Sequence, residues 1–285
     1  MSHPKAFNID SQCIIGGDFP LIIAGPCVVE SAELVLETAW ALKEITNRLG
    51  LPFVFKSSYD KANRTSHRSF RSIGFEPALK ILARVREDVN IPVLTDVHET
   101  SQVMAVMEVA DIIQIPAFLC RQTDLIQTVA RSGRVVNIKK GQFMAPEDMK
   151  FAVEKVTDTG NQRVFLTERG SSFGYHNLVV DMRSLVIMRQ FAPVVFDLTH
   201  SVQMPGGMNG RSGGQREFAP YLARAAAAVG VDGFFMETHP NPEKALSDGP
   251  NMVPLSEISA LLESLLEIWK VSRPYWESAS LSPVA

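Results

Sequence analysis

The chain has 285 residues, of which 46% are hydrophobic and 21% are charged, and this composition suits one domain that buries on the order of three quarters of its unfolded surface. The formal net charge of −3 gives no electrostatic footprint for nucleic acid or an anionic membrane. No apolar run approaches the roughly 20 residues of a membrane span, and the opening MSHPKAFNIDSQC lacks the long apolar core of a signal peptide, so we expect a cytoplasmic protein. The three cysteines are irregularly spaced, so we expect reduced thiols.

Eight short apolar runs recur along the chain and are predicted to be β-strands. They are continuous rather than alternating and rich in Val, Ile and Phe, as strands buried on both faces are. The runs are Leu21–Ala24, Phe53–Phe55, Val93–Leu94, Ile112–Ile115, Val135–Ile138, Val164–Leu166, Val194–Leu198 and Gly233–Met236. Between them, apolar residues at helical spacing predict helices at segments that include Leu34–Leu49, Ala78–Val89, Leu125–Ala130 and Tyr221–Val229.

This alternation predicts an α/β protein with a (β/α)8 TIM barrel. We expect a single domain over residues 1–285, with an N-terminal extension at 1–18 and a C-terminal tail at 271–285. An open doubly wound sheet gives the same alternation and is the alternative. Closure is favoured because nearly every strand ends in a polar or ionisable residue, whereas an open sheet would concentrate such residues at one switch point.

Four residues that suit a metal ion lie at or beyond the C-terminal ends of these strands: Cys27, His200, Glu237 and Asp248. In a closed barrel the last strand lies beside the first and the seventh, so these distant residues would converge at one rim. Together they form a plausible mixed set for Zn²⁺, Fe²⁺ or Mn²⁺. Singly, each could be an ordinary buried side chain, so the metal hypothesis depends on closure.

Cationic side chains follow the same strand ends, namely Lys56, Lys61, Arg64, Lys139 and Arg169, with Arg121 shortly after the fourth strand. Any one of them could be a solvated surface charge. Together, Arg and Lys suit phosphates and carboxylates, so the rim is predicted to bind polyanionic small molecules. Because no nucleotide-binding glycine loop is present, phosphorylated metabolites are the better hypothesis.

A glycine-rich segment, Met204–Gly214, follows the seventh strand. Its five glycines argue against a stable helix or strand interior. We interpret it as a mobile lid over a substrate, the alternative being a connection without a role.

Eight motifs give the chain a resemblance to the 3-deoxy-D-manno-octulosonate 8-phosphate synthase family, from about Phe19 to Lys270. They are AGPCVVES (24–31), FKSSYDKANRTS (55–66), TDVHE (95–99), QIPAFLCRQTDL (114–125), NIKKGQF (137–143), ERGSSFGYHNLVVDMR (168–183), FDLTHSVQ (196–203) and METHPNPEKALSDGP (236–250). The resemblance implies a barrel enzyme, usually a homotetramer, that condenses phosphoenolpyruvate with D-arabinose 5-phosphate and water for lipopolysaccharide synthesis. It implies no organic cofactor.

The resemblance also implies roles for individual residues. The family has two branches, a metal-dependent one with Cys in the first-strand motif and a metal-independent one with Asn there. Cys27 makes this chain similar to the metal-dependent branch, and the resemblance implies that its metal partners are His200, Glu237 and Asp248. Phosphoenolpyruvate would be held by Lys56, Ser58, Gln114, the Ala117 backbone, Lys139 and Arg169, and the sugar phosphate by Lys61, Asn63, Arg64 and Thr65. The candidate catalytic residues are His200, Asp248, Lys61 and Asn63, and Arg121 would reach the sugar phosphate of a neighbouring subunit.

Two rival functions remain open. One is 3-deoxy-D-arabino-heptulosonate 7-phosphate synthase, which uses erythrose 4-phosphate. Its corresponding loop typically reads KPRTS, whereas Ala62 and Asn63 replace that proline here and favour the longer sugar. The other is a non-catalytic sugar-phosphate sensor, which would be expected to have lost a ligand or a cation.

Overall fold

The computed structural model describes residues 6–11, 13–63, 69–208 and 211–278, and its centre is a ring of parallel strands. Eight strands form the ring within this part of the chain: β3 (Leu21–Gly25), β4 (Phe53–Lys56), β5 (Val93–Asp96), β6 (Ile112–Ile115), β7 (Val135–Lys139), β8 (Val164–Glu168), β11 (Val194–Asp197) and β14 (Gly233–His239). β14 pairs with β3 on one side and with β11 on the other, which closes the sheet. The predicted (β/α)8 barrel is therefore confirmed, and the open sheet is excluded.

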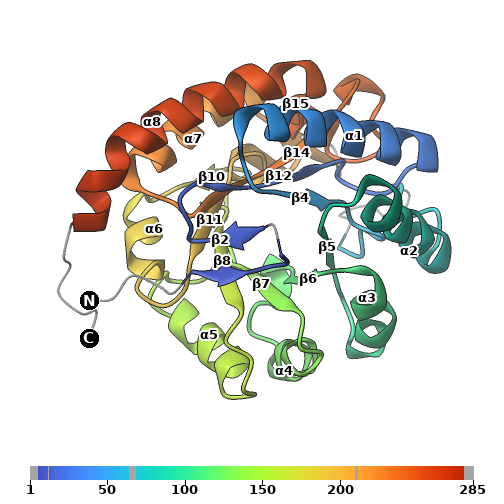
Figure 1. The fold of residues 1–285 in the computed structure, drawn as a ribbon, viewed down its shortest axis with the longest axis horizontal. Helices are drawn as coiled ribbons and strands as arrows, with labels where there is room; N and C mark the ends of the chain where they lie inside the picture. The colour runs from blue at the N-terminus through green and yellow to red at the C-terminus, as the bar shows by residue number, and fades with distance from the viewer. Residues whose placement is uncertain (1–5, 12, 64–68, 209–210, 279–285) are drawn as a thin grey trace.

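Helices surround the strands, as Figure 1 shows. They are α1 (Ala32–Leu49), α2 (Phe75–Arg84), α3 (Val103–Val109), α4 (Thr123–Arg131), α5 (Met149–Thr157), α6 (Arg183–Met188), α7 (Ala219–Val229) and α8 (Ile258–Ser278). Ser31 caps α1 by accepting a hydrogen bond from the backbone N–H of Leu34 at 3.2 Å, and Gly50 ends the helix in a left-handed conformation. Within the described residues, no helix combines the length and apolarity needed to cross a membrane.

The buried residues form two layers because successive side chains of a strand point to opposite faces. One cluster fills the barrel interior and contains Leu21, Ile23, Val54, Leu94, Ile112, Val135, Phe165, Val195 and Phe235. The other lies between the strands and the helices, and Ile22 and Phe55 belong to it. Both faces of each strand are therefore apolar, which explains the continuous apolar runs.

The N-terminal extension closes one end of the barrel. It forms an antiparallel pair, β1 (Phe7–Asn8) with β2 (Ile14–Ile15), drawn in dark blue over the middle of the ring in Figure 1. Ile9, Cys13 and Ile15 are buried and join the interior cluster. Cys13 Sγ lies 3.8 Å from the carbonyl of Phe53, the first residue of β4, so the pair covers the N-terminal ends of the strands.

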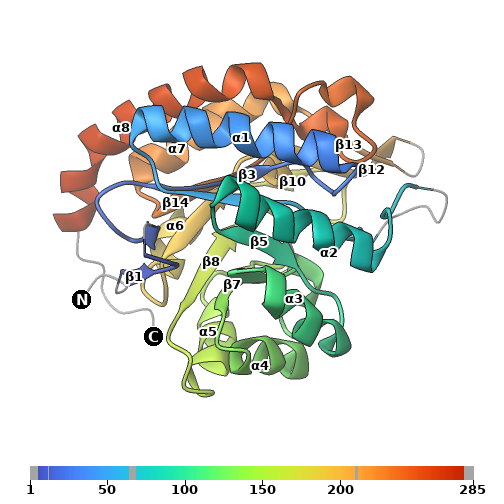
Figure 2. The ribbon, with the colours of Figure 1, turned by 45° about the vertical axis from the view of Figure 1, so that its right-hand side comes forward.

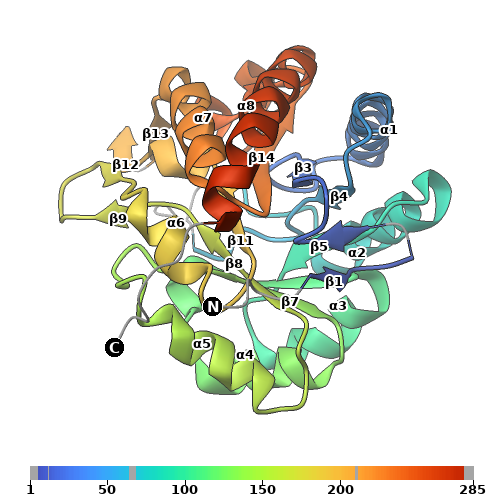
Figure 3. The same cartoon turned by 60° about the vertical axis from the view of Figure 1, so that its left-hand side comes forward.

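The structure corrects the expected start of the C-terminal tail. α8 continues through residues 271–278, although Pro274 lies inside it, and residues 279–285 fall outside the described part. The continuation is stabilised by packing, because Trp276 lies against the core and its ring centroid is 5.9 Å from that of Trp269. Trp276 also stacks on the guanidinium of Arg189 at 4.0 Å. Figure 3 shows this helix lying beside α7.

The glycine-rich segment contains strands, contrary to the expectation from its composition. β12 (Gln203–Met208) pairs antiparallel with β13 (Arg211–Gly214), so backbone hydrogen bonds hold the segment where side chains cannot. Figure 2 shows this hairpin at the end of the barrel opposite to β1. Residues 209–210 lie outside the described residues. The smaller strands are β9 (Ser171–Ser172), which pairs with β10 (Leu178–Val179), and β15 (Val253–Pro254), which pairs with β14.

Candidate active site

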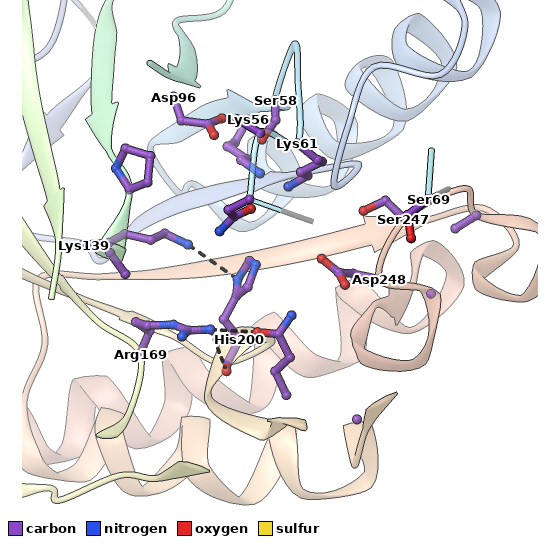
Figure 4. Close-up of a pocket in the computed structure, with 18 of the residues that line it drawn as sticks. Lys56, Ser58, Lys61, Ser69, Asp96, Lys139, Arg169, His200, Ser247 and Asp248 are labelled. Atoms are coloured by element: carbon purple, nitrogen blue, oxygen red, sulfur yellow. Dashed lines mark hydrogen bonds between the residues drawn. The ribbon is translucent and has the colours of Figure 1, made fainter. Parts of the chain in front are cut away.

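A cleft of about 1380 Å³ lies at the C-terminal ends of the barrel strands. Most of the residues that the sequence singled out line it: Lys56, Ser58, Lys61, Asn63, Gln114, Ala117, Lys139, Arg169, His200 and Asp248. Figure 4 shows the cationic side chains approaching the space around His200 from several strands. The cleft thus gathers residues from most of the length of the chain, as closure of the barrel requires.

Three of the four predicted metal ligands form a compact group. The ligand atoms of Cys27, Glu237 and Asp248 all lie within 4.8 Å of one another. The pairing of β3 with β14 sets Glu237 opposite Gly25, two residues before Cys27, and Cys27 Sγ lies 3.3 Å from Asp248 Oδ2. One sulfur and two carboxylate donors fit a divalent cation of borderline character.

His200, the fourth predicted ligand, lies beside this group rather than within it. Its Nε2 atom is 3.6 Å from Glu237 Oε1, and its Nδ1 atom is 2.7 Å from Asp197 Oδ2. The other oxygen of Asp197 accepts the backbone N–H of His200 at 2.9 Å. In the tautomer that donates Nδ1–H to Asp197, Nε2 has a free lone pair and faces the group of ligand atoms, an arrangement typical of metal-binding histidines.

Glu237 carries a negative charge among several cations. Lys56 Nζ lies 2.8 Å and Lys61 Nζ 3.5 Å from its Oε1 atom. Burial alone would raise the pKa of Glu237, but the neighbouring cations, chiefly Lys56 and Lys61, outweigh burial and hold this pKa well below the ordinary value. The carboxylate is therefore charged at neutral pH and available as a ligand.

The surroundings of Cys27 shift its pKa in the opposite direction, upward. Burial raises the pKa of its thiol well above the ordinary value, and the nearby Glu237 carboxylate raises it further. Ser247 Oγ lies 2.7 Å from its sulfur. Because a metal binds the thiolate, binding here requires the release of a proton.

Lys139 and Arg169 are buried cations of the cleft, and each contacts polar groups of the protein. Lys139 Nζ lies 2.5 Å from Asp197 Oδ2, and Arg169 Nη2 donates to the carbonyl of His200 at 3.3 Å and to Gln203 Oε1 at 3.0 Å. Arg169 Nη1 is buried and has no hydrogen-bond partner among the described residues, and the same holds for Gln114 Oε1. Buried polar atoms without partners at the floor of a cleft are suited to binding a polar ligand.

Arg121 does not line this cleft. It is exposed and borders a separate hollow of about 330 Å³, formed with Cys120, Met144, Asp148, Phe151, Ala152 and Lys155. Its backbone carbonyl accepts a hydrogen bond from Lys155 Nζ at 2.9 Å. Arg64 and Thr65 lie outside the described residues, so their predicted roles are not tested.

Sequence reasoning missed several residues of the site. Asp197 and Glu168 are buried acids at the last positions of β11 and β8, so the rule that identified the other strand-end residues could have found them. Ser247 and Asp96 line the cleft themselves, and Asp96 Oδ2 lies 3.5 Å from His98 Nε2. Asp96 belongs to the TDVHE motif, which by itself indicates no role for this residue.

Comparison with known proteins gives full-length similarity. The model of the DAHP synthetase I family matches residues 5–272. A 2-dehydro-3-deoxyphosphooctonate aldolase of Alkalilimnicola ehrlichii is 60% identical over 259 residues, which cover 90% of this chain and 94% of the relative. The enzyme of the same name from Bordetella petrii is 61% identical over 267 residues, covering 91% and 94%. That from Nitrosococcus oceani is 62% identical over 250 residues, covering 87% and 89%.

Proposed function

The chain belongs to the DAHP synthetase I family, and from this premise we propose that it condenses phosphoenolpyruvate with D-arabinose 5-phosphate and water. The products are 3-deoxy-D-manno-octulosonate 8-phosphate, for lipopolysaccharide synthesis, and inorganic phosphate. The observation that carries the proposal is the 60% identity, over nearly all of both chains, to a relative named 2-dehydro-3-deoxyphosphooctonate aldolase. The reaction is proposed to take place in the cytoplasm.

Phosphoenolpyruvate is assigned to the deep cations of the cleft. It brings a carboxylate and a phosphate, and Lys56, Lys139 and Arg169 supply three buried positive charges from β4, β7 and the end of β8. Burial lowers the pKa of Lys139 from its ordinary value despite the Asp197 carboxylate beside it, so a bound anion would favour its charged form. Ser58, Gln114 and the Ala117 backbone lie in the same cleft and would supply the remaining hydrogen bonds.

Arabinose 5-phosphate is assigned to the outer cleft. Lys61 and Asn63 line it there, and Arg64 and Thr65 follow them in the sequence. Arg121 lies outside its own cleft, so we propose that it completes the sugar-phosphate site of a neighbouring subunit in a homotetramer. A site that donates to the substrate hydroxyls discriminates strongly against a sugar that lacks them.

The chemistry requires two anionic substrates to meet. Carbon 3 of phosphoenolpyruvate forms a bond to the aldehyde carbon of the sugar while the aldehyde oxygen takes up a proton. Water adds at carbon 2, and the bond between carbon 2 and the phosphate oxygen breaks to release phosphate. The fixed cations offset the repulsion between the substrates and hold the reacting carbons together. His200 and Asp248 are proposed to move protons in these steps, and Lys61 and Asn63 to orient the aldehyde.

We propose that Cys27, His200, Glu237 and Asp248 hold a divalent metal ion, whether zinc, iron or manganese. The support is the clustering of three donor atoms within 4.8 Å and the orientation of His200 Nε2 toward Glu237. When bound, such an ion would polarise the aldehyde or orient the sugar beside the enol. The protein's own part is to keep Glu237 ionised through Lys56 and Lys61 and to fix the His200 ring through Asp197.

The test is phosphate release from phosphoenolpyruvate with arabinose 5-phosphate and erythrose 4-phosphate in separate assays. The family description names DAHP synthetase, so the second sugar is the necessary comparison. We expect kcat/KM to be at least on the order of a thousandfold higher with arabinose 5-phosphate. Comparable values for the two sugars would overturn the substrate assignment. Binding of both substrates without phosphate release would instead indicate a sensor.

A further inference from the structure

The turn that carries Arg169 is held by a buried carboxylate, Glu168. Glu168 Oε1 accepts the backbone N–H groups of Arg169 and Gly170 at 3.0 and 2.6 Å, and Glu168 Oε2 accepts the hydroxyl of Ser184 in α6 at 2.6 Å. Its side chain is only 1% exposed. Glu168 therefore fixes the direction in which the chain leaves β8 and enters the cleft.

Lys140 holds the same turn from the neighbouring strand. Its ammonium group lies 3.5 Å from Glu168 Oε1 and donates to the carbonyl of Gly170 at 3.3 Å and to Ser171 Oγ at 3.2 Å. The Lys140 side chain is 1% exposed and does not line the cleft. Gly170 has φ +90, which favours glycine, so the turn has a defined conformation contacted by both charges.

The guanidinium of Arg169 is the part of this turn that lies in the cleft. Nη2 is bound to His200 and Gln203, while Nη1 is buried and has no hydrogen-bond partner among the described residues. An arginine that binds an anion with two parallel N–H groups binds it more tightly when its plane is already fixed, because less conformational freedom is lost on binding. The orientation of that plane depends on the side-chain contacts and on the backbone position that Glu168 and Lys140 determine.

We propose that Glu168 and Lys140 are positioning residues that act through Arg169 on the binding of phosphoenolpyruvate. The identity of this anion rests on the proposed function. The competing interpretation is that the pair only stabilises the fold, since breaking a buried ion pair is destabilising wherever it lies. The two interpretations differ in whether the effect of replacing Glu168 on phosphoenolpyruvate binding depends on the presence of Arg169.

The experiment is a double-mutant cycle on the dissociation constant for phosphoenolpyruvate, measured by calorimetry without the sugar. We expect Glu168→Gln to weaken binding by roughly tenfold to a hundredfold, the effect of losing about one hydrogen bond between Arg169 and a charged ligand. In the Arg169→Ala background, where Lys56 and Lys139 remain in the cleft to bind the anion, Glu168→Gln should have little further effect. An equal loss in both backgrounds would overturn the proposal.

Two further variants separate positioning from stability. Asp232→Asn is the matched control, because Asp232 forms another buried pair, with Arg189 at 3.2 Å, and accepts the N–H of Val194 at the N-terminal end of β11. It should lower the Tm and leave phosphoenolpyruvate binding unchanged. Ser184→Ala removes one hydrogen bond to Glu168 and should weaken binding in the same direction by a smaller factor, so the cycle can use it if Glu168→Gln does not fold.

The cycle is independent of turnover. If the unchanged protein binds phosphoenolpyruvate but releases no phosphate with either sugar, the proposed function is overturned. The effect of Glu168→Gln on phosphoenolpyruvate binding, with and without Arg169, can still be measured. If Glu168→Gln lowers the Tm as Asp232→Asn does and leaves the dissociation constant unchanged, Glu168 is structural only and the inference is wrong.

Discussion

The ammonium group of Lys56 lies 2.8 Å from Oε1 of Glu237, although the two residues are 181 positions apart in the chain. Their strands, β4 and β14, both pair with β3, so the contact is a direct result of barrel closure. The same carboxylate belongs to the group of donor atoms with Cys27 and Asp248. Glu237 therefore joins the cations proposed to bind phosphoenolpyruvate to the residues proposed to bind a metal.

Arg121 is predicted to act across a subunit boundary. Neither Arg121→Ala nor Lys139→Ala alone should be active, because the first lacks a contact to the sugar phosphate and the second lacks a buried cation of its own cleft. Random exchange of the two kinds of subunit should restore about a quarter of the sites, those with an intact Lys139 and an intact neighbouring Arg121. The assay is phosphate release after verified subunit exchange, with each variant mixed with itself as the control. No recovery would mean that Arg121 acts within its own subunit or has no role.

The pH dependence of stability should show a contribution from Asp197. Burial alone would raise the pKa of this carboxyl, but His200 and Lys139 hold it below the ordinary value of 3.8. Below pH 3.8 the unfolded state binds the proton more readily than the folded state, so stability rises with pH in this range. The contribution is therefore fully present above pH 3.8 and is lost as the pH falls through the lower, folded value.

The measurement is the free energy of unfolding in denaturant as a function of pH. The curve of Asp197→Asn should be flatter than that of the unchanged protein below pH 3.8, whatever its overall stability. Asp181→Asn is the control, because Asp181 pairs with Arg183 at the exposed surface, where such pairs contribute little. Equal slopes for the unchanged protein and Asp197→Asn would show that Asp197 is not ionised below its ordinary pKa.

Gly25→Ala should disrupt the barrel directly beneath the site. A Cβ atom at this position would lie 2.1 Å from the backbone oxygen of Lys56, which cannot move without separating β3 from β4. We expect a loss of about 3 kcal/mol or more in stability and weaker phosphoenolpyruvate binding, because Lys56 would be displaced. Gly133→Ala is the comparison, since it has φ +74 and no atom within 4 Å, and should cost only about 1 kcal/mol. Similar losses for both variants would contradict this explanation.

Much of the architecture could be predicted from the sequence because buried parallel strands leave a clear pattern. All eight runs, from Leu21–Ala24 to Gly233–Met236, are strands of the barrel. The convergence of Cys27, Glu237 and Asp248 followed from closure alone, without any local spacing signature. Position at or beyond a strand end therefore indicated which residues converge at the site, whereas their separation in the sequence did not.

The features that the sequence did not reveal depend on tertiary contacts. Glycine content argued against strands in Met204–Gly214, but the backbone of β12 pairs with that of β13, and the missing Cβ of Gly214 leaves room for Asn251. The last turns of α8 depend on the packing of Trp276, which composition does not indicate. Asp197 resembles any other buried acid until its contacts with His200 and Lys139 are known.

The proposed metal site predicts coupled loss of a proton and gain of a metal at Cys27. Because burial raises the pKa of this thiol, it is protonated at neutral pH, and a metal must displace the proton. Addition of zinc to metal-free protein in weak buffer should therefore release about one proton from the unchanged protein and none from Cys27→Ala, and the affinity should rise with pH. Proton release of equal size from both proteins would show that the thiol is not a ligand.

Activity gives the second test of Cys27. A chelator should abolish phosphate release by the unchanged protein, and added divalent ions should restore it. Cys27→Ala retains only nitrogen and oxygen ligands and should be inactive although folded, since it removes a single buried side-chain atom. Cys27→Asn discriminates further, because the metal-independent branch of the family that the sequence resembles carries Asn at this position. It should keep a small activity that the chelator does not affect. If the unchanged protein stays fully active after demonstrated removal of all metal, the four-ligand hypothesis is wrong, and Cys27 is a buried thiol without a role in the reaction.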